Sequence, residues 1–426
     1  MNPPGTIPLV EPDFSEILVS STGYLRDGLD HFISTSGGDW KIVEFLNYLF
    51  PKACEDRASD IHMQHHTDGF RIRVRRSGEL VDDYYLNSGA SREINSKIRS
   101  RCKLEISDTE SPLDGKFTVG VNGRRVDVRV SILPSDLGQT IVCRLLDPNN
   151  AARDLNQIWM RDEQRTALMN ALDQEEGIIL TVGPTGSGKT TTLYGGLNYL
   201  NKPGIHVITA EDPIEYALPG ATQVSVHAHF RPFAKILRAM LRQDFEVGLV
   251  GEIRDPETAQ IAMTAANTGH LILSSLHTRR TLSTVTRLLD LEVKPYEIAD
   301  ALRLVVAQRL PKKICPHCSV EIQPTENHLS LFRIQAGAHP IDTSRPFWRA
   351  NAQGCEHCKN GYVGVIPVME MLVGTPSLCE AIERNDREVM RQEANSQPQY
   401  VPLFQAALNM SAERLVDYHT VLRYSQ

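Results

Sequence analysis

Residues 183–191 read GPTGSGKTT, and this stretch decides the fold of the larger part of the chain. Gly183, Gly188, Lys189 and Thr190 fit the pattern G-x-x-x-x-G-K-[ST]. In such a loop glycines let backbone N–H groups surround nucleotide phosphates, the lysine adds a point charge, and the hydroxyl holds Mg²⁺. The residues predicted to bind the nucleotide are Gly183, Pro184, Thr185, Gly186, Ser187, Gly188, Lys189, Thr190 and Thr191.

The segments on both sides of the loop argue against a chance glycine-rich turn. GIILTVG (177–183) is a short, β-branched apolar run that predicts a buried strand, and TTLYGGLNYL (191–200) has helical spacing. Apolar runs at 206–212, 246–255 and 270–278 predict three further buried strands. Strands that alternate with helical stretches predict a doubly wound α/β core.

The part of the chain before this core has mixed periodicity. A helical stripe at 41–50 is followed by alternating runs that turn at Ser77-Gly78. Helical spacing returns at 91–106, and a second hairpin turns at Asn122-Gly123 before a strand at 140–147. We therefore expect a short lead-in at 1–38, a small α+β domain at 39–148 and a polar linker at 148–154.

Acidic residues follow two of the predicted core strands. Glu252 ends the run LVGE, and the segment AEDPIEY supplies Glu211, Asp212 and Glu215. A nucleotide hydrolase needs a carboxylate near its metal and a group that orients the attacking water. One such cluster alone is equally consistent with a solvated loop, whereas two at strand ends beside a phosphate loop favour catalysis. His277 follows the last strand, and its position alone favours an ordinary structural histidine.

Four of the eight cysteines form two CxxC pairs. The pairs Cys315–Cys318 and Cys355–Cys358 suit one structural, tetrahedral Zn²⁺ bound by four thiolates, and this is the predicted ligand set. The alternatives are free thiols or a redox pair. We expect a zinc-binding insertion at 312–362, anchored by the metal in place of a hydrophobic core, within a phosphate-loop domain at 149–374. A helical C-terminal part follows at 375–426.

Composition limits the remaining classes. The chain of 426 residues has a net charge of −7, which gives no strong signal for nucleic-acid binding, although 71–80 carries four arginines. No apolar run has the roughly 18–20 residues that cross a bilayer, and the N-terminus lacks a signal-peptide pattern. We expect a cytoplasmic protein that reaches a membrane only through a partner.

In order, these motifs resemble the secretion ATPase family, which includes type II secretion (general secretion pathway protein E) and type IV pilus assembly motors. The matching segments are Walker A at 183–190, the Asp box at 209–216, an atypical Walker B at 246–252 and the His box at 268–278. The resemblance implies a RecA-like P-loop ATPase core. It implies Glu252 as the catalytic glutamate, Glu215 as a helper at the metal or water, and His277 as a sensor of the γ-phosphate.

Segment 57–80 resembles the ASDIH segment of the family, and segment 111–147 resembles its second N-terminal domain. The resemblance implies that the α+β domain at 39–148 is PAS-like. There the resemblance implies that Arg129 and Arg144 contact the nucleotide; the alternative is that both simply point outward from alternating strands. Some positions depart from the family pattern. Lys116 replaces an arginine and Leu113 a glutamine, while Phe245 replaces a proline and Gly248 a bulkier residue.

The resemblance implies a hexameric motor that uses ATP, Mg²⁺ and Zn²⁺. ATP hydrolysis would drive assembly of a type IV pilus or a type II secretion pseudopilus, at the inner membrane and through a platform protein. One alternative is a motor linked to conjugation or DNA transfer. The other is a nucleotide-binding regulator without turnover.

Overall fold

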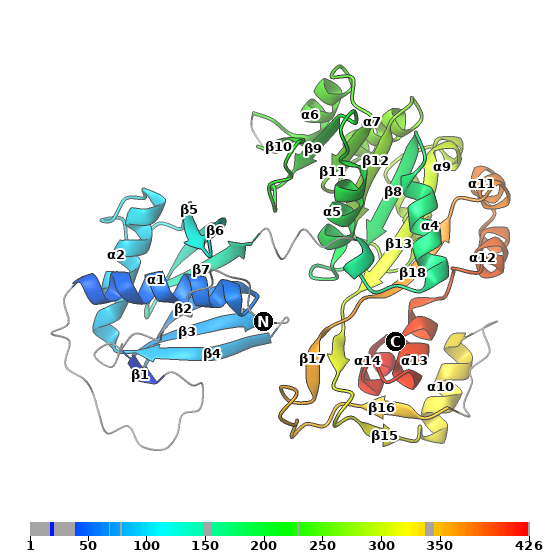
Figure 1. The fold of residues 1–426 in the computed structure, drawn as a ribbon. Coiled ribbons are helices and arrows are strands. Elements are labelled where there is room, and N and C mark those ends of the chain that lie inside the picture. The colour runs from blue at the N-terminus through cyan, green and yellow to red at the C-terminus, as the bar shows by residue number, and fades with distance from the viewer. Residues whose placement is uncertain are drawn as a thin grey trace. The chain divides into compact units, whose positions relative to one another are not determined.

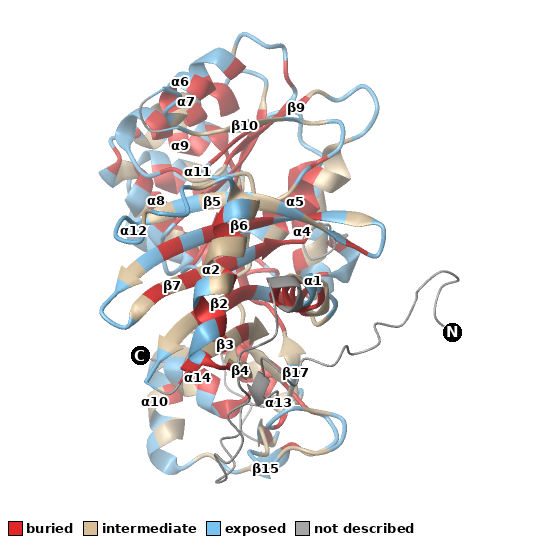
Figure 2. Cartoon of the chain, turned by 90° about the vertical axis from the view of Figure 1, so that its left-hand side faces the viewer, coloured by how far each residue is buried: buried red, intermediate tan, exposed pale blue. Residues whose placement is uncertain are grey.

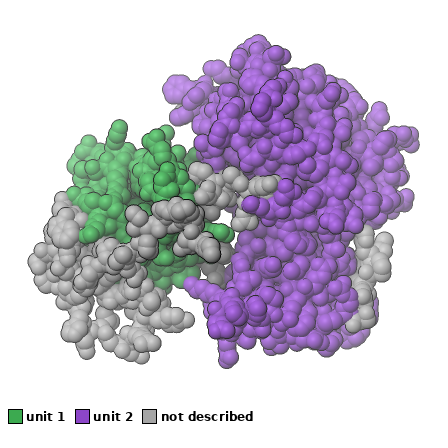
Figure 3. Space-filling model, viewed as in Figure 1, with its two compact units in different colours: residues 1–150 green, residues 151–426 purple. Residues whose placement is uncertain are grey.

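The protein is described by a computed structural model that covers residues 18–20, 39–67, 69–76, 79–147, 155–227, 230–336 and 345–424. The chain divides into two compact units, residues 1–150 and 151–426 (Figure 3). The boundary falls in the expected linker 148–154, which lies outside the described residues, as do the turn at Ser77-Gly78 and the lead-in 1–38 except for residues 18–20.

The first unit is built on one seven-stranded sheet with the order β1-β4-β3-β2-β7-β6-β5. Every neighbouring pair in this sheet is antiparallel. Two helices, α1 (Asp39–Glu55) and α2 (Ser88–Cys102), pack on the sheet (Figure 1). The strands are β1 (Leu18–Ser20), β2 (Ala58–His66), β3 (Gly69–Arg76), β4 (Glu79–Leu86), β5 (Leu113–Val121), β6 (Arg124–Ser135) and β7 (Gly138–Leu146).

The helices and hairpins expected in this unit are present, with two differences. Helix α2 begins after Asn87, whose side chain accepts the Ala90 N–H, and ends at Lys103 in the left-handed conformation. It therefore stops four residues before the predicted limit at 106. Strand β1, which pairs with β4, lies inside the lead-in, where no strand was expected.

The second unit contains a seven-stranded sheet with the order β10-β9-β11-β12-β8-β13-β18, parallel except for the β13–β18 pair. This confirms the predicted α/β class. The strands are β8 (Gly177–Val182), β9 (Val207–Glu211), β10 (Thr222–Ser225), β11 (Val247–Val250), β12 (Leu271–Leu276), β13 (Leu302–Arg309) and β18 (Val368–Val373).

Helices cover both faces of this sheet (Figure 1), and its strands β8, β9, β11 and β12 are buried throughout. Figure 2 colours the described residues of the whole chain by burial. In β8, Ile178 and Leu180 pack on one face with α6, α7 and α9, while Ile179 packs on the other with α4 and α5. The helices are η1 (Leu155–Gln157), α4 (Asp162–Leu172), α5 (Lys189–Leu200), α6 (Phe233–Met240), α7 (Pro256–Ala266), α8 (Thr281–Asp290) and α9 (Pro295–Ala301).

Three strands of the sheet have no counterpart in the sequence prediction: β10, β13 and β18. Helix α9 ends at Ala301 and β13 begins at the next residue, so no turn residue marks the change of period. Strand β18 pairs with β13 although more than 50 residues separate them in sequence. Pairing across such a distance leaves no local pattern.

The insertion contains β14 (Lys312–Ile314), β15 (Val320–Ile322), α10 (Glu326–Ala336), β16 (Phe347–Arg349) and β17 (Tyr362–Val365). Four helices follow it: α11 (Pro376–Glu383), α12 (Arg387–Ser396), α13 (Leu403–Ala412) and α14 (Tyr418–Tyr424). Among the described residues no helix combines the length and apolar character that crossing a bilayer requires.

The expectation that zinc takes the place of a hydrophobic core in the insertion is wrong. Phe332 of α10 and Phe347 of β16 are fully buried, and both rings contact Tyr418 of α14. Asp417 also accepts the Ala350 N–H at 2.7 Å. The insertion and the C-terminal helices α13 and α14 therefore share one core, which Figure 1 shows as α10, β15, β16, α13 and α14 lying together.

Candidate nucleotide site and cysteine cluster

The phosphate loop joins β8 to α5, and its glycines adopt conformations that other residues rarely take. Gly183, Gly186 and Gly188 have φ angles of 150°, 77° and 88°. A Cβ on Gly183 would lie 2.5 Å from the carbonyl oxygen of Gln308, and one on Gly188 would lie 2.6 Å from its Nε2. The loop is therefore shaped by its own backbone and by close contact with β13.

Lys189 is the first residue of α5 and folds back over the loop. Its Nζ donates to the carbonyl oxygens of Gly183 at 2.9 Å and Pro184 at 3.1 Å. Burial lowers the pKa of Lys189, the charge of Glu252 opposes that shift, and Arg309 adds to it. The ammonium group thus lies against the backbone of the loop, within electrostatic reach of one acidic and one basic side chain.

Glu252 follows β11 and lies next to the loop after β12. Its carboxylate, 13% exposed, pairs with His277 Nε2 at 3.4 Å and with Arg254. The two strand ends are held together because Ile253 N–H donates to the Ser275 carbonyl, while Ser275 Oγ donates to the Gly251 carbonyl. The sequence analysis did not identify Arg254, although its position two residues after Glu252 was a signal for it.

The Asp-box residues have different environments. Glu211 is buried and accepts hydrogen bonds from Tyr194 at 2.5 Å, Thr209 at 2.6 Å and Gln223 at 3.2 Å. Burial and the Glu211 charge raise the pKa of Tyr194, which keeps its hydroxyl a donor. Glu211 therefore joins β9 to the phosphate-loop helix.

The segment after Glu211 carries Glu215, which is half-buried. Tyr194 and Gln223 both donate to the Tyr216 carbonyl, at 3.2 and 2.9 Å, and so hold this segment beside α5. Asp212 is exposed and lies close enough to Arg254 to raise its pKa. The carboxylates of the two predicted clusters thus lie along neighbouring strand ends of one sheet.

Phe245 and Gly248, two departures from the family pattern, contact each other. A Cβ on Gly248 would lie 2.8 Å from the Phe245 ring and 2.9 Å from Ile272 Cδ1. The Phe245 ring also packs on His270, with ring centres 4.4 Å apart. Because Gly248 has no side chain, the Phe245 ring can occupy the space beside it.

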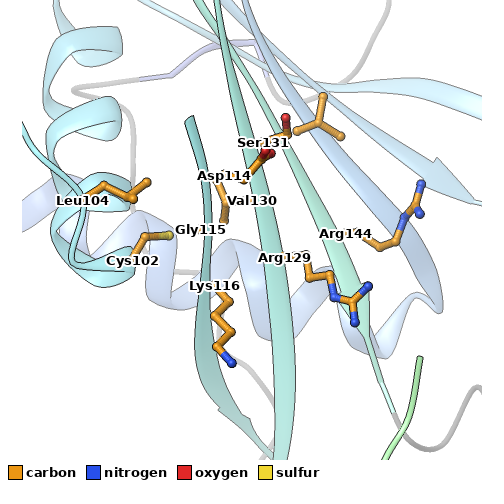
Figure 4. A pocket seen from close by; sticks show the side chains of 10 residues that line it. Cys102, Leu104, Asp114, Gly115, Lys116, Arg129, Val130, Ser131 and Arg144 are labelled. Carbon is orange, nitrogen blue, oxygen red and sulfur yellow. The ribbon is translucent and has the colours of Figure 1, made fainter. Parts of the chain in front are cut away.

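In the first unit, Lys116, Arg129 and Arg144 lie side by side on β5, β6 and β7, because they are direct cross-strand partners (Figure 4). They line a cavity of about 660 Å³ together with Asp114 and Ser131, among others. Arg144 Nε pairs with Asp60 at 3.1 Å. Like charges directly opposite each other destabilise a sheet, so this basic row would be stabilised by a bound anion.

The four predicted zinc ligands come together from two distant segments. Their Sγ atoms all lie within 4.8 Å of one another. Cys315–Cys355, Cys318–Cys358 and Cys355–Cys358 are 3.8, 3.6 and 3.6 Å apart. Tetrahedral Zn²⁺ with bonds of about 2.3 Å would place its sulfurs about 3.8 Å apart. The cluster therefore has the spacing of a four-thiolate zinc site, and β14 pairs with β17 beside it.

A family profile described as type II/IV secretion system protein matches residues 36–423. The chain belongs to this family. It is 38% identical over 364 residues to the type IV pilus assembly ATPase PilB of Pseudomonas aeruginosa, covering 84% of this chain and 63% of that protein. It is 40% identical over 353 residues to the type II secretion system protein E of Pectobacterium carotovorum subsp. carotovorum, covering 82% and 69%.

Solved structures share the fold of this family member. The Legionella pneumophila ATPase DotB superposes with a TM-score of 0.65 at 19% identity, covering 89% of this chain and 95% of that one. The pilus retraction motor PilT superposes with a TM-score of 0.59 at 23% identity, covering 89% and 96%. The predicted family and fold class are thereby confirmed.

Proposed function

We propose that this chain is the ATPase subunit of a motor that drives assembly of a type IV pilus or a type II secretion pseudopilus. The observation that carries the proposal is the strand order β11-β12-β8, which brings the start of the phosphate loop to the sheet edge where Glu252 and His277 lie. The side chains of Glu252 and His277 are 3.4 Å apart there. The relatives named as a pilus assembly ATPase and a secretion protein support the choice of system. The chain spans 63% of the length of the first and 69% of the second.

In the proposed reaction, ATP phosphates take the place of the Gly183 and Pro184 carbonyls as partners of Lys189. Thr190 and Glu215 would hold Mg²⁺, which neutralises charge on the β- and γ-phosphates. Glu252 would accept the proton of the attacking water. Because His277 and Arg254 contact the same carboxylate, movement of His277 toward the γ-phosphate would change how Glu252 is held.

The basic row of Lys116, Arg129 and Arg144 would contact the nucleotide, with the two arginines neutralising charge that develops on the transferred phosphoryl group. The basic row would complete the nucleotide site from a neighbouring domain or subunit, and completion from another subunit requires a homo-oligomer. We propose a hexamer. Zn²⁺ bound by the four cysteines would be structural, because four thiolates leave no open position. We further propose a cytoplasmic protein that is peripheral at the inner membrane through a platform partner.

The decisive experiment is the ATPase rate per subunit as a function of protein concentration. The proposal expects a rate that rises with concentration in the wild type and is lost in Lys189→Ala and Glu252→Gln. Lys202→Ala is a matched control, since Lys202 lies just past the other end of α5 and its ammonium group lies over the Tyr199 ring, away from the phosphate loop. ATP that binds without turnover at any concentration would favour the nucleotide-binding regulator. ATPase activity stimulated by DNA and sensitive to salt would favour the DNA-transfer motor.

A further inference from the structure

Gln308 is the one polar residue among the buried positions of β13, next to the end of the strand. It lies against both ends of the phosphate loop. It follows Ala307, which pairs with Val182, so it lies beside Gly183 across the β13–β8 pair. Only 2% of its surface is exposed. Its carbonyl oxygen closes the space at Gly183, and its Nε2 closes the space at Gly188.

The side-chain amide of Gln308 is also fixed to the helix that the loop starts. Its Oε1 accepts a hydrogen bond of 2.8 Å from Thr192 Oγ1, and Thr192 is likewise buried. A buried polar group that loses its hydrogen-bond partner destabilises the folded state, because the group was removed from water without compensation. The bond therefore fixes the start of α5, and with it the backbone N–H groups of the loop, against β13.

Arg309, the next residue, extends this contact to the other half of the site. Its Nη1 donates to the Gln308 carbonyl at 3.0 Å and its Nη2 to the Arg279 carbonyl at 3.1 Å. Arg279 lies two residues after His277. One guanidinium thus joins the strand that supports the phosphate loop to the segment that carries His277.

We propose that Gln308 and Arg309 are positioning residues with separate roles. Gln308 holds the phosphate loop in the shape that binds nucleotide, and Arg309 holds the His277 segment in the place that turnover requires. This inference rests on the proposed ATPase function. Neither residue belongs to the motifs that the sequence analysis selected, although a glutamine within LRLVVAQRL was a visible exception in an apolar run.

The test separates affinity from turnover in the full-length chain. Equilibrium dissociation constants for MgATP, measured with a fluorescent ATP analogue in competition, are compared with kcat at saturating ATP. Gln308→Met keeps the volume but loses the amide, and we expect about a tenfold weaker affinity, with kcat within about twofold, since a net hydrogen bond contributes about 1 kcal/mol. Thr192→Val removes the same hydrogen bond, so we expect the double variant to be no weaker than either single variant.

Arg309→Lys keeps the charge but loses the two-pronged donor. We expect about a tenfold lower kcat with the MgATP dissociation constant within about twofold, because only the His277 segment is displaced. Arg303→Lys is the matched control: Arg303 lies at the opposite end of β13 and also donates to two carbonyls, those of Glu176 and Asp300. Gln405→Met is the control for Gln308, since Gln405 is a buried glutamine on α13.

Each outcome decides the inference. Unchanged affinity in both Gln308→Met and Thr192→Val overturns the role of Gln308, and equal losses in the two arginine variants overturn that of Arg309. A Gln308→Met chain that does not fold leaves Thr192→Val to decide, because that change replaces one hydroxyl with a methyl group of similar size. A wild-type chain that binds no ATP overturns the proposed function itself. A wild-type chain that binds ATP, together with variants whose affinity and kcat are unchanged, overturns only the inference about Gln308 and Arg309.

Discussion

The two units each contain a seven-stranded sheet, and the two sheets carry polar chemistry in different places. The first sheet is entirely antiparallel, and β5 alternates between half-buried and exposed residues. In the second, four parallel strands are buried at every position. An antiparallel sheet can leave one face open, whereas helices cover both faces of a parallel one.

This difference decides where functional side chains can be. Because β8, β9, β11 and β12 are buried along their whole length, functional side chains there are accessible only past the strand ends. Glu252 and His277 lie just past the ends of β11 and β12. In the first unit a row such as Lys116, Arg129 and Arg144 can lie in the middle of three strands. The comparison predicts where a charge substitution lowers the ATPase rate most. In the second unit such substitutions are at strand ends, and in the first unit they are on the open face of the sheet.

The largest effect is expected for Glu252→Gln, at the carboxyl end of β11. The amide keeps the shape but cannot accept a proton, so we expect kcat to fall about 10³-fold or more with ATP still bound. Glu246→Gln is the matched control, because Glu246 lies at the opposite end of the same strand and accepts the His206 N–H. Single-turnover hydrolysis measures the difference in rate. Equal losses of rate in both variants would contradict the prediction that the carboxyl ends of these strands carry the catalytic groups.

Cys318→Ser tests a region outside both sheets. The β14–β17 pair has only two strands, and such a pair is marginal without further support. We expect the wild type to hold one zinc ion per chain, and the variant to lose zinc and to be cut faster by protease within 312–362. Cys379→Ser on α11 should keep its zinc. Metal analysis and limited proteolysis provide the two measurements, and zinc retained in Cys318→Ser would contradict the four-thiolate site.

Arg129→Ala tests the open face of the first sheet. If the row contacts the transferred phosphoryl group, we expect kcat to fall about 10²-fold, less than for Glu252→Gln, since neighbouring cations remain. Arg125→Ala changes an exposed arginine on the same face of β6, four residues away, and should have little effect. Steady-state ATPase assays compare the two, and similar rates would assign Arg129 to an ordinary exposed position.

The sequence predicted those parts of the molecule whose signal is local. The phosphate loop, the four strands that carry the motifs and the Asn122-Gly123 hairpin each combine a period with a turn or a polar end. The pairing of the four cysteines was predictable because zinc chemistry fixes the ligand number. The open-face row could be named from the family resemblance, but its cross-strand register came only with the structure.

What the sequence could not provide depends on contacts between distant residues. The Thr192–Gln308 bond spans 116 residues, and the contact of Phe332 in the insertion with Tyr418 spans 86. The Glu211–Tyr194 bond gave Glu211 a buried, anchoring position that its place in an acidic cluster did not indicate. Local sequence patterns do not report contacts between distant residues, so these contacts were not predicted.

The smallest expected effect compares one methyl group in each sheet. Gly248→Ala in buried β11 would press against the Phe245 ring and Ile272, and we expect about 1–3 kcal/mol lower stability. Gly120→Ala on β5 adds its methyl where no atom lies within 4 Å, and we expect equal or slightly higher stability, by up to about 0.5–1 kcal/mol. Chemical denaturation followed by a probe in each unit measures both changes.

The same pair of residues supplies an internal control for this prediction. Phe245→Leu removes the ring that Gly248 accommodates, so the double variant Phe245→Leu/Gly248→Ala should be more stable than the sum of the single losses by about 1 kcal/mol. Such coupling would show that the two departures from the family pattern compensate each other. Strict additivity would contradict that account, and a Gly120→Ala loss as large as that of Gly248→Ala would remove the distinction between the two sheets.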